Sequence, residues 1–290
     1  MRLSTVILPL ARWPASREKW RRAEELGFYA AYTYDHLWWL SLRNGPWFGA
    51  IPTLTAAAVE TSTIRLGTLV TSPNFRHPVP LAKDFLTLDD VSNGRLIVGA
   101  GAGGAGNDSA ALGGEDWTQR ERTGRFGEFV SLLDELLREP ITSRQGAYYS
   151  ANDVRMLPGT LQRPRPPFCI AAAAPRSFAV AVEYGQAWVT YGLFENEKRT
   201  CFDAVASQVS RLNDALDTAS RPRHDIERVL LDGLSDERPL ASLDAFVDWA
   251  GRYQALGMTE LVIHWPEPDC LFDFDMTVFE KIATEGLSQL

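Results

Sequence analysis

The chain has 290 residues, of which 45% are hydrophobic and 23% are charged. These proportions are typical of a globular protein and exclude a disordered chain, a collagen and a coiled coil. The formal net charge of −8 argues against a nucleic-acid partner, because proteins that bind nucleic acids usually carry a basic surplus. No run approaches the ~18 apolar residues of a membrane-spanning helix, so we expect no membrane partner.

The three cysteines, Cys169, Cys201 and Cys270, lie far apart in the sequence. An odd number of distant cysteines indicates a reducing compartment rather than a disulfide framework. We find no Cys-x-x-Cys pair and no Cys/His spacing of a zinc site, and therefore expect no bound metal. The apolar stretch near the amino terminus is short and is interrupted by Pro9, which argues against a signal peptide. We therefore expect a cytoplasmic protein.

Short apolar runs alternate with amphipathic segments along the chain. Eight of these runs are predicted to be strands, at residues 3–8, 28–34, 64–70, 95–100, 168–172, 187–191, 226–231 and 261–265. Such continuous apolar runs are typical of parallel strands that are buried on both faces.

A helix is predicted after each of these strands. The first helix is expected to begin with a cap at Ser16 and to end at Gly27. The fourth is the clearest, because apolar side chains recur at helical spacing at Phe126, Phe129, Val130, Leu133, Leu136 and Leu137. The others are expected at residues 52–61, 80–91, 176–184, 196–218, 243–256 and 278–287. Residues 146–149 suggest an additional hairpin before the fifth strand.

Eight strand–helix units in this length predict an α/β fold, a single (β/α)8 TIM-like barrel in which residues 1–290 form one domain. A doubly wound sheet is the alternative, although it usually uses fewer units. Catalytic side chains of a barrel lie at the carboxyl ends of its strands. Two long loops are expected at these ends, an aromatic loop after the second strand and a glycine-rich loop after the fourth strand.

Asp35 and His36 directly follow the second predicted strand. A histidine changes its charge near neutral pH, so the two residues are candidates for a proton donor and its partner. The structural alternative is that His36 caps the following loop and that Asp35 binds backbone amides.

Aromatic side chains gather on the predicted strand-end loops, at Trp38, Trp39, Trp47, Phe48 and Phe75. They are expected either to stack on a flat ring or an apolar substrate, or to pack as a lid on the barrel. His264 and Trp265 follow the eighth strand and complete the predicted substrate pocket, although a buried core position is an equal alternative for His264. Tryptophans on predicted helices and strands belong to the expected core, at Trp20, Trp188 and Trp249.

The glycine-rich loop begins with GAGGAG at residues 101–106, which matches the dinucleotide fingerprint G-x-G-x-x-G. An NAD enzyme with a doubly wound fold is therefore one hypothesis. That fingerprint normally lies at the first strand–helix turn, whereas here it follows the fourth strand. A long surface loop is the simpler interpretation of the pattern.

Seven segments of the chain together resemble the bacterial luciferase-like oxidoreductases, which use FMN or the deazaflavin coenzyme F-420. They are AEELGF, YDHL, IRLGTLV, RHPVPLAKDFLTLDDVSNGRLIVGAGAG, LPGTLQRPRPPF, APRSFAVAVEYGQAW and TELVIHW. They occur in the order of the family and cover nearly the whole chain. The resemblance implies a TIM-like barrel, in agreement with the strand count.

The resemblance also implies roles for individual residues. Asp35 and His36 match an Asp-His pair of the deazaflavin-dependent branch, in which the histidine lies beside the reactive ring. Leu69 and Val70 match a non-proline cis peptide that supports this ring. Other matches to cofactor-contacting positions are Ala102 and Asn107 and, in the segment that holds the cofactor phosphate, Ala172, Ala173, Ala174, Pro175 and Arg176.

Two positions depart from the family pattern. Gly104 stands where deazaflavin-dependent dehydrogenases carry a glutamate proton donor, so we do not expect a sugar-phosphate dehydrogenase. Ala173 and Ala174 replace a frequent Gly-Gly pair before the proline of the phosphate segment, and alanine tolerates a positive φ poorly.

The function implied by the resemblance is that of an F-420-dependent oxidoreductase. It would transfer a hydride between the cofactor and a small organic substrate, apolar or ring-bearing, while His36 handles the proton. An FMNH2-dependent monooxygenase of the same family is the first alternative, and a non-catalytic flavin-binding relative is the second. The habit of the family implies a homodimer.

Overall fold

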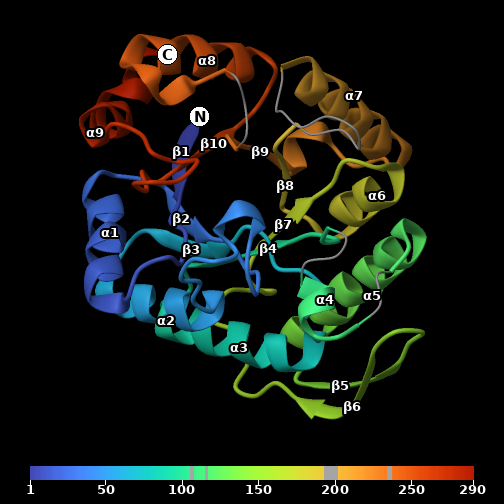
Figure 1. Ribbon diagram of the computed structural model, residues 1–290. Coiled ribbons are helices and arrows are strands. Elements are labelled where there is room, and N and C mark those ends of the chain that lie inside the picture. The colour runs from blue at the N-terminus through green and yellow to red at the C-terminus, as the bar shows by residue number, and fades with distance from the viewer. Residues whose placement is uncertain (105–107, 115–116, 193–201, 234–236) are drawn as a thin grey trace.

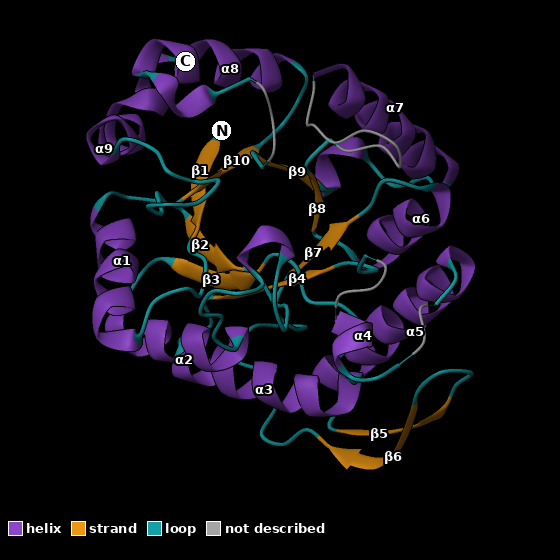
Figure 2. Ribbon diagram, in the orientation of Figure 1, coloured by secondary structure: helices purple, strands orange, loops and turns teal. Residues whose placement is uncertain are grey.

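Eight parallel strands close into a barrel, which is seen end-on in Figure 2. The computed structural model describes residues 1–104, 108–114, 117–192, 202–233 and 237–290. The order of strands around the barrel is β1-β10-β9-β8-β7-β4-β3-β2. Their bounds are β1 Arg2–Val6, β2 Ala30–Thr33, β3 Arg65–Thr68, β4 Leu96–Ala100, β7 Phe168–Ala171, β8 Ala187–Thr190, β9 Glu227–Leu231 and β10 Glu260–His264. The predicted TIM-like barrel is confirmed, and each predicted strand run contains one of these strands or overlaps it.

Helices surround the barrel (Figure 1). They are α1 Trp13–Glu25, α2 Ala50–Glu60, α3 Pro78–Val91, α4 Asp108–Ala111, α5 Gln119–Arg138, α6 Pro175–Tyr184, α7 Phe202–Thr218, α8 Leu243–Ala255 and α9 Met276–Glu285. Short 3-10 turns occur at Leu40–Leu42, Arg223–Asp225, Pro239–Ala241 and Gly286–Gln289. In the part of the chain that the structure describes, no helix combines the length and the apolar character needed to cross a membrane.

The start of α1 differs from the prediction. The helix begins at Trp13, with proline in its first turn, and Ser16 lies inside it. Ser16 is buried, and its hydroxyl accepts a hydrogen bond of 3.4 Å from the indole nitrogen of Trp20. The predicted cap at Ser16 is therefore wrong, because Pro14 already supplies the preset φ that starts a helix without needing a backbone donor.

The predicted hairpin is present as two antiparallel strands, β5 Ile141–Gln145 and β6 Ser150–Arg155, which lie outside the barrel (Figure 1). Its turn is held by Glu128 of α5, whose carboxylate accepts hydrogen bonds from the backbone amides of Ala147, Tyr148 and Tyr149. The excursion is thus attached to the helix ring outside the barrel.

Side chains of the barrel strands alternate between two apolar layers. Along β10, Leu261 and Ile263 pack outward against the helices, whereas Val262 points into the barrel. The three tryptophans expected in the core, Trp20, Trp188 and Trp249, are at most 1% exposed. This alternation decides which strand-end residues reach the mouth of the barrel.

Candidate active site

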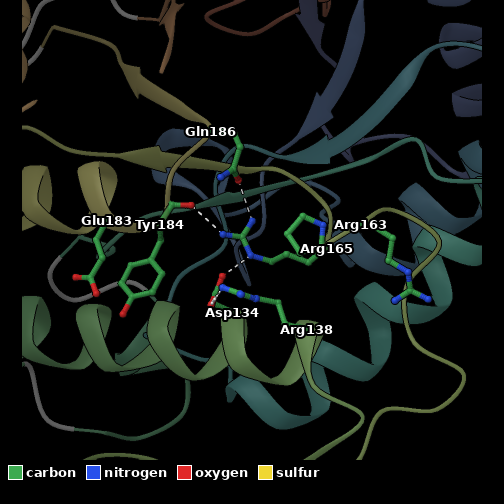
Figure 3. A pocket seen from close by; sticks show the side chains of 8 residues that line it. Asp134, Arg138, Arg163, Arg165, Glu183, Tyr184 and Gln186 are labelled. Atoms are coloured by element: carbon green, nitrogen blue, oxygen red, sulfur yellow. Dashed lines mark hydrogen bonds and ion pairs between the residues drawn. The ribbon is translucent and has the colours of Figure 1, made fainter. Parts of the chain in front are cut away.

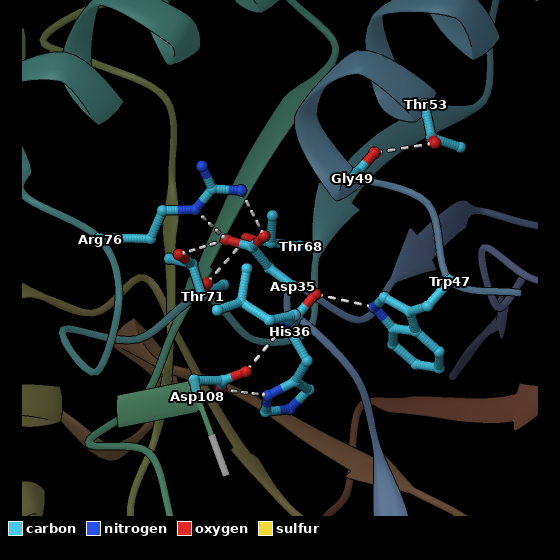
Figure 4. A network of polar contacts seen from close by, with 11 residues as sticks. Asp35, His36, Trp47, Gly49, Thr53, Thr68, Thr71, Arg76 and Asp108 are labelled. Carbon is cyan, nitrogen blue, oxygen red and sulfur yellow. Dashed lines mark hydrogen bonds and ion pairs between the residues drawn. The ribbon is translucent and has the colours of Figure 1, made fainter. Parts of the chain in front are cut away.

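Polar side chains converge at the carboxyl ends of β2, β3 and β4 (Figure 4). His36 lies just beyond β2, and its ring Nδ1 is 2.7 Å from Oδ2 of Asp108. Its backbone carbonyl accepts a hydrogen bond of 2.7 Å from the indole nitrogen of Trp47. The side chain of His36 is 21% exposed. Ring and backbone are therefore held from two different loops, and Nε2 has no partner among the described residues.

Asp35 belongs to a separate network (Figure 4). It is fully buried, and Arg76 donates to both of its carboxylate oxygens, at 3.0 Å from Nε and 2.6 Å from Nη2. The hydroxyl of Thr71 donates a further bond of 2.6 Å. The carboxylate that bonds the His36 ring is thus Asp108, and the described contacts do not join Asp35 to His36.

The non-proline cis peptide lies between Leu69 and Val70, the position that the resemblance implies. Ser72 and Asn74 follow it at the end of β3. Both are buried, and the hydroxyl of Ser72 and the Oδ1 of Asn74 have no hydrogen-bond partner among the described residues. Buried polar atoms of this kind normally have a partner, so these two oxygens mark a place where a polar group is expected to bind.

The glycine-rich loop packs against Asn74. Gly103 has a φ of +72°, and a Cβ there would lie 2.4 Å from the side-chain nitrogen of Asn74, so only glycine fits. The carbonyl of Gly104 accepts a hydrogen bond of 2.8 Å from that nitrogen. Ala102 is partly buried at the start of the loop. The predicted cofactor contact Asn107 lies outside the described residues.

The predicted phosphate segment, Ala172 to Arg176, connects β7 to the amino terminus of α6. The backbone amides of Ala173 and Ala174 both point at the hydroxyl of Ser177, at 3.3 and 3.2 Å. Neither alanine has a positive φ, so replacement of Gly-Gly does not strain the backbone. Pro175 and Arg176 are exposed at the helix start. An exposed helix amino terminus of this kind is suited to an anion.

Two of the predicted aromatic residues meet the interior of the barrel. Trp39 packs edge-on against Tyr34, with ring centroids 5.3 Å apart, and Trp47 also contacts the interior cluster. Trp38 instead lies under the guanidinium of Arg43, and Phe75 under that of Arg76, both with 4.6 Å between guanidinium carbon and ring centroid. The structure therefore packs Trp39 and Trp47 against the interior of the barrel, whereas Trp38 and Phe75 are held by arginines.

His264 is buried beneath these aromatics. Its Nε2 lies 2.8 Å from the hydroxyl of Tyr34, and its Nδ1 lies 2.8 Å from the carbonyl oxygen of Asp232. Its ring stacks on Phe272 with 3.8 Å between centroids. Burial lowers the pKa of His264 to about 3, so the ring is neutral. Its contacts are those of a satisfied core histidine.

Trp265 faces the other side of β10. It packs against Phe279 of α9, in the layer between barrel and helices, and is 4% exposed. This differs from the predicted position in a substrate pocket. The reason is the strand alternation, because His264 and its neighbour Trp265 point to opposite faces.

A cavity of about 430 Å³ lies away from this constellation (Figure 3). It opens beside Arg165, which precedes β7 and therefore belongs to the opposite end of the barrel. The guanidinium of Arg165 is already bound to Asp134 at 2.6 Å, to Gln186 at 2.9 Å and to the carbonyl of Tyr184 at 2.9 Å. These contacts tie α5 and α6 to the strand and give the arginine a structural role.

A family model described as luciferase-like monooxygenase matches residues 5–261. The chain belongs to this family. The match covers almost all of the barrel, and it confirms the family that the sequence segments indicate.

Two relatives carry the name "F420-dependent glucose-6-phosphate dehydrogenase". The protein from Intrasporangium calvum is 32% identical over 254 residues, which are 82% of this chain and 73% of that protein. The protein from Microbacterium testaceum is 30% identical over 212 residues, which are 72% of this chain and 60% of that protein. Among solved structures, the monooxygenase RslO1 from Streptomyces bottropensis superposes with a TM-score of 0.79 at 22% identity, covering 99% of each chain. That likeness shows the shared fold.

The candidate active site contains two important groups that the amino-acid sequence alone did not identify. Asp108 binds His36, and Arg76 binds Asp35. Each carried a recognisable signal. Asp108 is an acidic residue at the start of a short helix just after a strand-end glycine loop. Arg76 closely follows the third strand end, where a barrel gathers its functional groups.

The residues of the candidate active site fit a flat, polar redox cofactor. The unpartnered oxygens of Ser72 and Asn74 could hydrogen-bond to polar atoms of such a group. The exposed amino terminus of α6 is suited to a phosphate, whereas the amides of Ala173 and Ala174 just before it already donate to the hydroxyl of Ser177. The chain thus shares its family with relatives that are named as F420-dependent dehydrogenases.

Proposed function

We propose that the protein is an F-420-dependent oxidoreductase acting on a small organic substrate. The observation that carries the proposal is the environment of His36. Its Nδ1 is bound to a buried carboxylate, and its Nε2, at the barrel mouth, is left without a partner by the residues that the structure describes. The names of the two relatives support the choice of cofactor.

When bound, the deazaflavin would accept or donate the hydride, which is chemistry that no side chain provides. The cofactor ring is assigned to Leu69 and Val70, with Asp35, Ala102 and Asn107 beside it. Its phosphate is assigned to Ala172, Ala173, Ala174, Pro175 and Arg176. The Asp35–Arg76 ion pair joins the residue after β2 to the loop after β3 in this wall.

The chain's own residues handle the proton. His36 is proposed to take a proton at Nε2 from a substrate hydroxyl as hydride leaves the adjacent carbon. General base catalysis of this kind contributes about 10²- to 10⁴-fold in rate. Trp39 and Trp47 cover the mouth and exclude water from the reacting atoms.

The substrate is proposed to be uncharged and apolar or ring-bearing. The proposed pocket is walled by Trp38, Trp39, Trp47 and Phe75, with His264 and Trp265 buried behind the wall. The charge of Arg76 at this end of the site is used by Asp35, and Arg43 lies over the ring of Trp38. A sugar phosphate is proposed to be a poor substrate, because Gly104 stands in place of a glutamate.

An FMNH2-dependent monooxygenase is the second candidate function. The description of the matching family model, luciferase-like monooxygenase, favours it, and so does Gly104, because that chemistry does not require a glutamate donor at this position. We further propose that residues 1–290 act as one catalytic domain, in a cytoplasmic homodimer.

The decisive experiment is a pair of titrations of the purified protein with F-420 and with FMN, followed by tryptophan fluorescence. Binding of F-420 alone, at micromolar concentration, supports the proposal. Binding of FMN alone, with oxygen consumption after reduction, replaces it by the monooxygenase. Binding of neither overturns both, and binding of either without turnover of any alcohol or ketone tested indicates a non-catalytic relative.

A further inference from the structure

Asp108 joins two loops that lie far apart in the sequence. It is the first residue of α4 and is 1% exposed. One carboxylate oxygen, Oδ1, accepts a hydrogen bond of 2.8 Å from the backbone amide of Leu37. The other oxygen, Oδ2, is 2.7 Å from Nδ1 of His36. Both oxygens of a single buried carboxylate are therefore engaged with the segment that follows β2 (Figure 4).

These contacts determine where the hydrogen on the His36 ring lies. An ionised carboxylate only accepts hydrogen bonds, so Nδ1 must donate and must carry the hydrogen. A neutral imidazole has one N–H, and Nε2 is then a bare acceptor. The bond from the indole of Trp47 to the carbonyl of His36 holds the backbone of this residue in place.

We propose that Asp108 is a positioning residue which holds neutral His36 in the tautomer with hydrogen on Nδ1, so that Nε2 is the atom that accepts the substrate proton. The catalytic half of this inference, that Nε2 accepts the substrate proton, rests on the proposed function. The tautomer half, that His36 carries its hydrogen on Nδ1, concerns the protein without cofactor or substrate. The arrangement prepares His36 to act as the base that takes the hydroxyl proton when an alcohol gives up its hydride to the cofactor, rather than as the acid that protonates a carbonyl oxygen.

The substitution Asp108→Asn tests the inference with little change of shape. Its amide oxygen can keep the bond from the Leu37 amide, whereas its NH2 group would donate to Nδ1 of His36. The hydrogen of the neutral ring would then move to Nε2, and the base would become a donor. Asp108→Ala removes both bonds and leaves the ring free to exchange tautomers.

The other histidines of the chain provide references for this measurement. His264 is bound through Nδ1 to the carbonyl of Asp232, which fixes hydrogen on Nδ1. His77 accepts a bond of 3.2 Å from the amide of Val79 at Nδ1, which fixes hydrogen on Nε2. The side chain of His224 is 87% exposed, and its Nε2 lies 3.3 Å from a carboxylate oxygen of Asp225, which favours hydrogen on Nε2. One spectrum of the protein thus contains references for both tautomers.

The experiment is an NMR spectrum that correlates ring nitrogens and protons in 15N-histidine-labelled protein without any cofactor, at pH 8.5. We expect His36 to resemble His264 in the unmodified protein and His77 in Asp108→Asn. Unchanged signals of His264 and His77 show that the variant has kept its fold. Hydrogen on Nε2 of His36 in the unmodified protein, or no change in Asp108→Asn, overturns the inference.

Turnover is measured with F-420 and 2-propanol or cyclohexanol. We expect kcat of Asp108→Asn to fall by about 10²- to 10⁴-fold, as for loss of a general base, with the dissociation constant of F-420 unchanged. Asp108→Glu, which keeps the carboxylate, should recover part of the rate. A tautomer switch without loss of turnover overturns the catalytic half. Absence of turnover in the unmodified protein counts against the proposed function. The tautomer of His36 is then still decided by the NMR spectrum.

Discussion

The two neighbouring residues Asp35 and His36 serve different networks. His36 is one-fifth exposed and reaches the barrel mouth, whereas Asp35 is fully buried and bound to Arg76 and Thr71. Adjacent residues point in different directions as a strand ends, so sequence adjacency does not imply a shared function. Each residue therefore needs its own test.

We expect His36→Ala to leave F-420 binding within about twofold and to lower kcat by about 10²- to 10⁴-fold, because only the proton transfer loses its partner. Steady-state kinetics and the fluorescence titration measure the two effects separately. His224→Ala, at a solvent-exposed position, is the matched control. Unchanged turnover in His36→Ala would remove this residue from the mechanism.

Arg76→Met is expected to destabilise the fold by about 3–5 kcal/mol, because it leaves the buried Asp35 carboxylate without its cation. The double variant Asp35→Asn/Arg76→Met should recover a large part of this loss, since no charge then remains buried. Urea unfolding measures both, with Arg17→Met as a surface control. If the double variant is no more stable than the single variant, the pair does not act as we describe.

Single carboxylates also fasten whole elements to the barrel. Glu24, near the end of α1, accepts hydrogen bonds from the backbone amides of Ser62, Thr63 and Ile64 just before β3. Glu128 holds the turn of the β5–β6 hairpin in the same manner. In both cases a helix places an anion where a turn exposes consecutive amides, which fixes the entry of the next strand.

The carboxylate of Glu24 predicts an acid-sensitive contact. Desolvation alone would raise its pKa, but the bonds from Thr63, Ile64 and Ser62 prevail and lower the pKa to about 2. A depressed pKa stabilises the fold above pH 4.5, the ordinary range of glutamate, and this contribution is lost as the pH falls toward 2.

Glu24→Gln should therefore lower the stability by about 1 kcal/mol at pH 7, a small value because solvent screens this partly exposed group. The difference from the unmodified protein should shrink at pH 3. Thermal unfolding at the two pH values measures it, and Glu25→Gln on the exposed face of the same helix is the control. An equal loss at both pH values would show that the charge of Glu24 is not responsible.

At the scale of the whole molecule, the pH dependence of stability includes an opposing contribution from Asp232. This residue follows β9 and is 6% exposed. Burial, together with the charge of Glu237, raises its pKa to about 7. An acid whose pKa is raised by folding favours the folded state while it is protonated, so this contribution falls as the pH rises from about 4 to 7.

Asp232→Asn removes this buried charge. We expect its Tm at pH 8 to rise by about 2 °C or more, and the gain to disappear near pH 4, where the native side chain is already neutral. Scanning calorimetry at the two pH values measures the difference. Asp248→Asn, whose side chain is 79% exposed, is the control. A lower Tm at pH 8 would contradict the prediction.

The number and order of the strands could be predicted because each strand is a local apolar run whose composition reports its own burial. Once a strand end is located, the residues that stand there can be read from the sequence. The amino-acid sequence alone therefore indicates His36 as a candidate for proton transfer. Helix boundaries depend on finer signals. Both Pro14 and Ser16 are compatible with a first helical turn, so the sequence alone did not show that Pro14 marks the start of α1.

The sequence by itself thus determined the barrel, the family and the segments that form its mouth. Only the tertiary structure decided the partners, His36 with Asp108 across 72 positions and Asp35 with Arg76 across 41. It also decided that Trp265 faces the helices while His264 faces the barrel. The physical reason is that periodicity is a property of one segment, whereas a hydrogen bond between loops depends on how the closed barrel brings distant strand ends together.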